Sequence, residues 1–386
     1  MKAYNETLLR NEYAQALAQR LKKEGKLNDT QNLEIQKLHA DLPYNTNIFI
    51  KILLFLFGCL GFGMGGSLMA MFIVGFNESF WGFAIVSAFY GIGAIILLIF
   101  LIRDRKLYFS GIDNAVIYCV LGAFMPLVYQ IYETLHLQEP WLAALLFLPF
   151  LLLTIYVFGE PIIALSAFLT VLFIIASLFM KHPLGKALLP FVLMICAGIT
   201  YGLLHRFSQK KESFYWTTAL EWTSIVAMVL FYAAGNYYVV REANAALNNL
   251  PAPAPEIAFA PLFWGLTFVV PVLYLYLGFR WRDRLVLLLG LLGVVASVMT
   301  YRFYHAVLPT EWGMVLGGLV AVVVAIFVIR QLKTPRFGFS NLPEENEKIG
   351  IETVILSQMT QNIQAADHGL KLGGGDFGGG GAGEKY

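Results

Sequence analysis

The stretch that decides the fold runs from Ile48 to Phe76 and reads IFIKILLFLFGCLGFGMGGSLMAMFIVGF. A helix over its roughly 29 residues, at a rise of about 1.5 Å per residue, is about 43 Å long. That length exceeds the hydrocarbon core of a bilayer, which is about 30 Å thick. The only charged residue in the stretch is Lys51, close to its start. The sequence therefore predicts a first membrane span with Lys51 at its entrance.

Similar apolar runs continue along most of the chain. Hydrophobic residues make up 58% of it and charged residues 13%, whereas soluble domains contain about 25% charged residues. The runs are too long and too uniformly apolar for barrel strands, and a backbone in lipid must satisfy its own hydrogen bonds. The sequence thus predicts an all-α, polytopic transmembrane bundle of about ten spans: 48–76, 81–102, 112–132, 141–158, 161–180, 187–205, 215–238, 257–279, 285–300 and 312–329.

One pair of these runs has two interpretations. Only Gly159 and Glu160 separate 141–158 from 161–180, so the pair is either two full spans or one re-entrant segment. The run 285–300 is also short, since a membrane helix usually needs about 20 residues. The number of spans depends on these segments.

Basic residues are distributed unevenly between alternate loops. Lys and Arg in short loops are retained on the cytosolic side of a membrane. With a cytosolic N-terminus, the external loops hold only Lys181, Lys186, Arg241 and Arg302. We therefore expect both the N-terminus and the C-terminus in the cytosol. The residues that this orientation places inside are Arg103, Arg105, Lys106, Arg206, Lys210, Lys211, Arg280, Arg282, Arg284, Arg330, Lys333 and Arg336.

Residues 1–47 are polar and predict a cytosolic leader of two short helices. Gly25 is a natural stop for the first, Asn28 or Asp29 can cap the second, and Pro43 ends it. A frayed, partly ordered leader is the alternative. The apolar residues with helical spacing are Leu9, Tyr13, Leu17 and Leu21, followed by Leu33, Ile35, Leu38 and Leu42.

The remaining chain divides into the bundle, residues 48–330, and a cytosolic tail, residues 331–386. The tail has helical spacing of apolar residues over 344–372 and then a Gly-rich end that we expect to be flexible. The longest external connection, 239–256, contains alternating prolines and predicts an extended spacer.

The glycines of the first span have several readings. Gly61, Gly63 and Gly66 satisfy a GxGxxG pattern, but the strand and the acidic residue of a dinucleotide site are missing. Gly61 and Gly65 have the small-xxx-small spacing of helices that pack closely in lipid, which is the interpretation we favour. The alternative is that the glycines between Gly58 and Gly66 break the helix, as in some transporters.

Glu221 is the most informative ionisable residue in the apolar runs. With Thr217, Ser224, Met228 and Tyr232 it forms a polar stripe on one face of a predicted helix. Thr217, Glu221, Ser224 and Tyr232 therefore form a candidate transport or proton site. The alternative is that Glu221 reaches the interface or pairs with a basic loop residue.

A second candidate site is an outer polar vestibule. Glu133 and His136 follow the third predicted span, Arg302 and His305 end the ninth, and Glu311 begins the tenth. These side chains could line a vestibule or bind a metal, but no two histidines are close in sequence. A belt of interfacial polar and aromatic residues is the favoured reading.

Recognisable catalytic motifs are missing from the sequence: we find no GxSxG, HExxH or P-loop pattern. Cys59, Cys119 and Cys196 lie in apolar runs without metal-site spacing and read as small hydrophobic residues. We expect no catalytic, cofactor-binding or metal-binding residue. The net charge of +2 does not indicate a nucleic-acid partner, and none is expected; the bilayer is the predicted partner.

The leader carries a short element, GKLNDTQ at residues 25–31, before a long series of closely spaced spans. This layout resembles the bacterial predicted membrane proteins that are grouped under domains of unknown function, although the Gly-rich tail departs from them. The resemblance implies a location in a bacterial inner membrane and assigns no activity. The sequence favours a non-catalytic membrane component that acts through protein partners at its leader or tail. The alternative is a transporter or channel for a small solute or ion that uses the Glu221 stripe, and a membrane enzyme is less supported.

Overall fold

The computed structural model describes residues 2–305, apart from residues 24, 26, 45, 46, 75–79 and 282. Within these residues the regular structure is helical, and nine helices are long and apolar enough to cross a membrane. The all-α prediction is confirmed, while the run 312–329 and the tail lie outside the described residues. The nine helices are α3 (Ile48–Val74), α4 (Phe80–Arg105), α5 (Ile112–Thr134), α6 (Pro140–Phe158), α7 (Pro161–Phe179), α8 (Pro183–Ser208), α9 (Thr217–Gly235), α11 (Ala260–Trp281) and α12 (Arg284–Tyr304).

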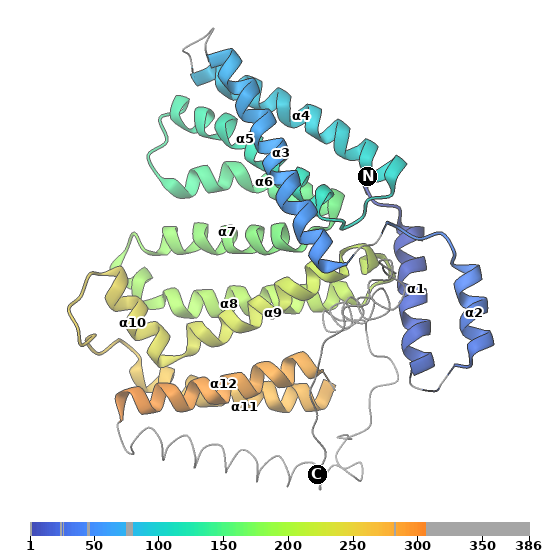
Figure 1. The fold of residues 1–386 in the computed structure, drawn as a ribbon. Coiled ribbons are helices and arrows are strands. Elements are labelled where there is room, and N and C mark those ends of the chain that lie inside the picture. Colours follow the sequence, from blue (N-terminus) through green and yellow to red (C-terminus); the bar gives the residue numbers. More distant parts are fainter. Residues whose placement is uncertain are drawn as a thin grey trace, which may run out of the picture.

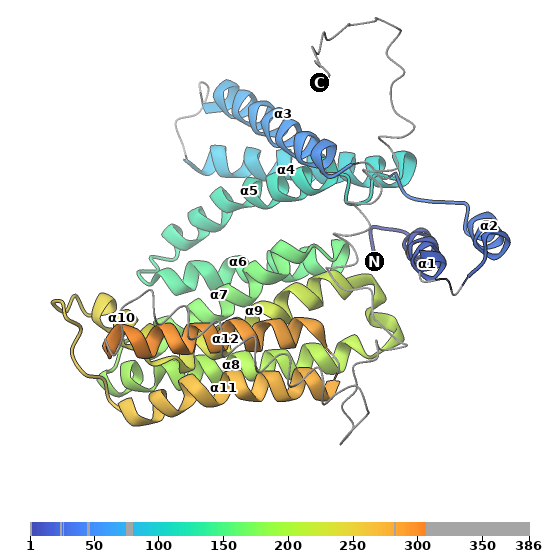
Figure 2. The ribbon, with the colours of Figure 1, turned by 60° about the horizontal axis from the view of Figure 1, so that its bottom comes forward.

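The long helices lie side by side in a row, with α3, α4 and α5 at one side and α11 and α12 at the other (Figure 1). Helices that follow each other in sequence pack together, as α4 does on α5, α8 on α9 and α11 on α12. Figure 2 shows the same row turned by 60°. Because successive helices alternate in direction, the basic loops after α4, α8 and α11 lie at the same ends of the long helices. By the two ends of the row we mean these two levels, at which the long helices begin and end.

The pair α6 and α7 is two separate helices, each with 19 residues. Gly159 ends α6 with a φ of 64°, in the left-handed region that glycine adopts most easily. A Cβ at Gly159 would lie 3.1 Å from the Tyr215 carbonyl oxygen. The tight turn is therefore possible because the residue is glycine, and the structure favours two full spans over a re-entrant segment.

Two boundaries differ from those expected. The predicted span 215–238 begins with a 3-10 helix, η1 (Lys211–Trp216), and its helix α9 stops at Gly235. The next residue, Asn236, then caps a further helix, α10 (Tyr237–Leu247), by accepting a hydrogen bond from the Val239 amide. The connection 239–256 is therefore partly helical, and the prediction of an extended spacer is wrong for its first half.

Helix α3 is continuous through all its glycines, so the described structure does not contain a broken first span. Its close contacts are not those expected. A Cβ at Gly58 would lie 2.7 Å from Ala115 Cβ, and Gly65 and Gly66 lie against the Tyr90 ring, whereas a Cβ at Gly61 would meet nothing within 4 Å. Gly58, Gly61 and Gly65 lie within about 60° of one another around the helix axis, so the positions of the neighbouring helices, and not the spacing, determine which of them is in close contact. Among the described residues Gly65 lies at a helix contact and Gly61 does not, and the packing role of the pair stays a prediction.

The leader forms the two predicted helices, α1 (Glu6–Lys23) and α2 (Asp29–Leu38). Asn28 caps α2 with a capping box, in which its side chain accepts from the Gln31 amide and the Gln31 side chain accepts from the Asn28 amide. Gly25, with a φ of 72°, lies in the turn between the helices. Figure 1 shows α1 and α2 as a hairpin across the end of the row where α3 begins.

Candidate functional site

The loop between α4 and α5 folds around the carboxylate of Asp113. Asp113 Oδ1 accepts hydrogen bonds from the Ser110 amide at 2.8 Å and the Ser110 hydroxyl at 2.9 Å, and Oδ2 accepts one from the Phe109 amide at 2.7 Å. The side chain has no exposed surface. A negative charge in the first turn of a helix is also favoured by the helix dipole. These three donors satisfy the buried carboxylate of Asp113.

Tyr4 connects the leader to this carboxylate. Its hydroxyl donates to Asp113 Oδ2 at 2.7 Å, and only 2% of the residue is exposed. The Tyr4 ring packs against Tyr108, with ring centres 4.9 Å apart, and against Phe109 at 5.0 Å. Burial, followed by the charge of Asp113, raises the pKa of the Tyr4 hydroxyl well above its usual value. Tyr4 therefore stays a hydrogen-bond donor at physiological pH.

The backbone on either side of Tyr4 is also held. The Ala3 amide donates to the Val157 carbonyl at 2.9 Å, and the Tyr4 amide donates to the Tyr215 hydroxyl at 3.3 Å. The Tyr215 hydroxyl in turn donates to Val157, and the Asn5 amide donates to the Tyr108 hydroxyl at 2.9 Å. The start of the leader thus contacts the α4–α5 loop, the end of α6 and η1 together.

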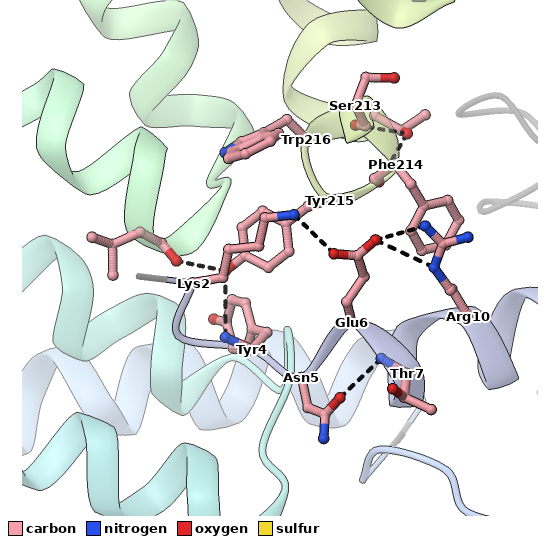
Figure 3. A network of polar contacts seen from close by, with 12 residues as sticks. Lys2, Tyr4, Asn5, Glu6, Thr7, Arg10, Ser213, Phe214, Tyr215 and Trp216 are labelled. Carbon is pink, nitrogen blue, oxygen red and sulfur yellow. Dashed lines mark hydrogen bonds and ion pairs between the residues drawn. The ribbon is translucent and has the colours of Figure 1, made fainter. Parts of the chain in front are cut away.

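A charged layer covers these contacts. Figure 3 shows Glu6 between Lys2 and Arg10, which bind it at 2.8 and 2.6 Å. The hydrogen bond from Lys2, and then that from Arg10, holds the pKa of Glu6 below its usual range. The Lys2 amine also lies 4.7 Å from the centre of the Trp216 ring, and the Arg10 guanidinium 4.8 Å from that of Phe214. Both contacts are within the range of cation–π interactions.

A second carboxyl, that of Glu160 between α6 and α7, is buried beside Asp113. Glu160 is 3% exposed; it accepts hydrogen bonds from the Tyr118 hydroxyl and from the Asn114 amide group, both at 2.7 Å. Burial raises the pKa of the Glu160 carboxyl to about 7; the bonds from Tyr118 and Asn114 oppose this rise and the charge of Asp113 adds to it. Glu160 therefore exchanges a proton near neutral pH.

We call the buried contact between the leader and the row the leader dock, formed by Tyr4, Asp113, Val157, Glu160 and Tyr215. Chemically, it contains the Asp113 carboxylate, which accepts hydrogen bonds from four donors, and the Glu160 carboxyl, whose raised pKa allows it to take up a proton near neutral pH. Among the described residues, no group of three or more His, Cys, Asp or Glu side chains is placed to hold a metal ion. The raised pKa of the buried Glu160 carboxyl supports proton binding at this site.

The predicted stripe on α9 is divided by the structure into two parts. Thr217, Glu221 and Ser224 lie half-buried near the start of α9, where the Thr217 hydroxyl donates to the Phe214 carbonyl at 2.9 Å. Met228 is 6% exposed and belongs to a packed core cluster with Val270, Tyr274 and Val286. No comparison tests the role of Thr217, Glu221, Ser224 and Tyr232, so the transport site stays a prediction.

Tyr232 belongs to a different polar cluster, near the opposite end of α9. Its hydroxyl donates to the Gly293 carbonyl at 3.0 Å, lies 3.0 Å from the Ser297 hydroxyl and accepts from the Asn236 side chain at 3.0 Å. Asn236 also exchanges hydrogen bonds with Thr300. These contacts fix α9 against α12 and explain why the polar residues there are buried.

The predicted vestibule residues lie on helices that are apart. Glu133 lies in the last turn of α5 and His136 just after it, and Arg302 and His305 lie at the end of α12; Figure 1 shows these two helices separated by α6 to α11. The His305 ring contacts Tyr301 and Trp264, with centres 4.8 and 5.5 Å apart. Glu311 is outside the described residues. The two halves of the predicted vestibule thus come from helices that do not follow each other, and the vestibule stays a prediction.

The leader dock was missed in the sequence because its members are distant from one another. Tyr4 and Asp113 are 109 residues apart, and Asn114 and Glu160 are 46 apart. A signal was present, however. Asp113 and Glu160 are acids at the start of spans on the side where the loops are otherwise basic, and a charge at a span boundary is a functional hypothesis.

Comparisons with known proteins assign no role to the site. No protein-family model, curated protein or solved structure matches the chain.

Proposed function

We propose that the protein is a multi-pass component of a cell inner membrane that acts by binding a protein partner through the α1–α2 hairpin. The nine apolar helices of the described residues support the membrane part of this proposal. The hairpin lies at the end of the row that carries the basic loops, which favours the cytosolic side. The tail, residues 331–386, is a second expected partner surface and is outside the described residues.

The observation that carries the proposal is the exposed apolar surface of the hairpin. Leu33 is 53% exposed and Leu38 is 81% exposed, and Leu42 and Tyr44 follow at 37% and 48%. These residues lie outside the span-length helices, whose exposed leucines are expected to face lipid. Several large apolar side chains exposed to water on one short element favour a binding surface for another protein.

The leader dock makes this surface suitable for binding. Because Tyr4 and the charged layer fix the start of the leader, the hairpin is held on the end of the row and is not a loose arm. A surface that is already ordered loses less conformational entropy when a partner binds. The arrangement therefore supports a partner-binding role better than it supports catalysis.

The test is site-specific photocrosslinking in native membranes. A photoreactive amino acid at Leu38 should give one discrete protein adduct, and the adduct should weaken when Leu33→Gln is added. Leu184 is the matched control, since it is also a leucine, is 77% exposed and lies at the start of α8, at the other end of the row. The same adduct at both positions, lipid adducts alone, or an adduct within the chain would overturn the proposal.

A further inference from the structure

We propose that Glu160 is a proton-binding site that controls the leader: the leader is docked when Glu160 is protonated and detaches when Glu160 ionises. The effect of this switch on partner binding rests on the proposed function. The equilibrium between docked and detached leader does not depend on it. The inference is built on the geometry that Tyr4, Asp113 and Glu160 share.

The first two turns of α5 connect the Asp113 carboxylate with the Glu160 carboxyl. Asp113 accepts a hydrogen bond from the Tyr4 hydroxyl of the leader. Its neighbour Asn114 and the residue one turn later, Tyr118, donate hydrogen bonds to Glu160. A change in the charge of Glu160 therefore acts on the structure that anchors the leader.

The leader also binds the chain next to Glu160, and Tyr4 is within electrostatic range of that carboxyl. The Ala3 and Tyr4 amides bind Val157 and Tyr215, which lie next to the Gly159–Glu160 turn. When these contacts open, water reaches the turn and can solvate an ionised carboxylate. Detachment of the leader is thus the change that relieves the cost of a buried charge with the least rearrangement.

The charges around Glu160 do not compensate its ionisation. Asp113 already carries one negative charge, and Lys51 at the start of α3 lies within electrostatic range of Asp113 and of Glu12. Burial raises the pKa of Glu12 as well, and Lys51 opposes that rise. Lys51 thus interacts with Glu12 and Asp113, whereas the charge that acts on Glu160 is that of Asp113, which opposes its ionisation. The titratable groups that surround the site are Tyr4 and Glu12 of the leader, Lys51 of α3, Tyr108 of the α4–α5 loop, Asp113 and Tyr118 of α5, and Tyr215 of η1.

The ratio of detached to docked leader changes over a physiological range of pH. Burial raises the pKa of Glu160 to about 7 from a usual value of 4.5, and detachment should return it toward the usual value. For these two values, linkage predicts that the ratio of detached to docked leader increases by roughly 30-fold between pH 5.5 and pH 8.5.

The experiment measures leader docking by thiol labelling in lipid nanodiscs, without any partner. Ala3→Cys is placed in the docked segment, and Thr7→Cys, on the exposed side of α1, is the reference. A membrane-impermeant maleimide is applied between pH 5.5 and 8.5, and peptide mass spectrometry separates these sites from the native cysteines. The ratio of the two labelling rates removes the intrinsic pH dependence of thiol reactivity.

We expect this ratio to increase by tenfold or more with pH in the otherwise native chain and to stay low and flat when Glu160→Gln is added. Tyr4→Phe, which removes the bond to Asp113, should increase the ratio at every pH. A flat ratio in the native background, an undiminished increase in Glu160→Gln, or no effect of Tyr4→Phe would overturn the proposal. Because no partner is present, these outcomes are independent of the crosslinking test.

Discussion

Replacing Glu160 with glutamine should remove a pH dependence from the stability of the whole protein. The pKa of Glu160 is raised in the folded state to about 7, against a usual value of 4.5 that we take for the unfolded chain. Between these values the folded protein binds the proton more tightly than the unfolded chain does. Stability is therefore highest below about pH 4.5 and is lost as the pH rises through 7.

The magnitude follows from the difference between the two pKa values. At about 1.36 kcal/mol per pKa unit, the complete loss is about 3 kcal/mol, of which about 2 kcal/mol falls between pH 5.5 and 8.5. The residue is 3% exposed, so solvent screening reduces this figure little. The Glu160→Gln variant carries a neutral side chain at every pH and should not show the loss.

The assay is equilibrium unfolding in detergent micelles at a series of pH values, followed by tryptophan fluorescence. Glu139→Gln is the matched control, because Glu139 also precedes a helix but is half-exposed and pairs with Lys181 at 2.8 Å. This control keeps Glu160 and should keep the pH dependence of the native chain. The reasoning is refuted if Glu160→Gln loses stability with pH as the native chain does, or if the native chain becomes more stable between pH 5.5 and 8.5.

The remaining predictions concern the first span and the α9 stripe. Gly58→Leu should destabilise the protein by about 1–3 kcal/mol through overpacking, whereas Gly61→Leu should change stability by less than about 0.5 kcal/mol; equal effects in the same unfolding assay would contradict the observed helix contact. If the Glu221 stripe carries protons or ions, Glu221→Gln should abolish pH-driven flux in proteoliposomes, and flux equal to that of the native protein would reject this use of the residue.

Local signals made much of the fold predictable. The capping box of Asn28 and Gln31, the positive φ of Gly25 and the length of the apolar runs are all determined by neighbouring residues. The structure agrees with the sequence at these positions because the physical cause lies within one turn or one helix. Even the two-residue connection at Gly159 could be read as a helix end from its glycine and the proline that follows Glu160.

Contacts between distant elements were not predictable in the same way. Gly61 and Gly58 lie in one apolar helix, and only the position of Ala115 on α5 determines which of them packs closely. Likewise, Tyr232 at the far end of the predicted α9 stripe belongs to a separate polar cluster, because α12 supplies the Gly293 carbonyl to which its hydroxyl donates. Helical spacing shows which residues share a face, but the neighbouring helix decides what that face does.

The leader dock combines a local signal, the turn at Gly159 and Glu160, with contacts between distant elements. In this site the burial of Glu160 and the docking of the leader depend on each other. A glutamate in a two-residue turn between spans would ordinarily face the aqueous interface, and it is buried here where Ala3 and Tyr4 bind the adjacent chain. In the proposed switch, the leader contributes to the burial that raises the pKa of Glu160. By thermodynamic linkage, the proton must then favour docking by the same factor by which docking favours the proton. A leader that binds a partner only when docked would couple that partner to the proton concentration on its side of the membrane.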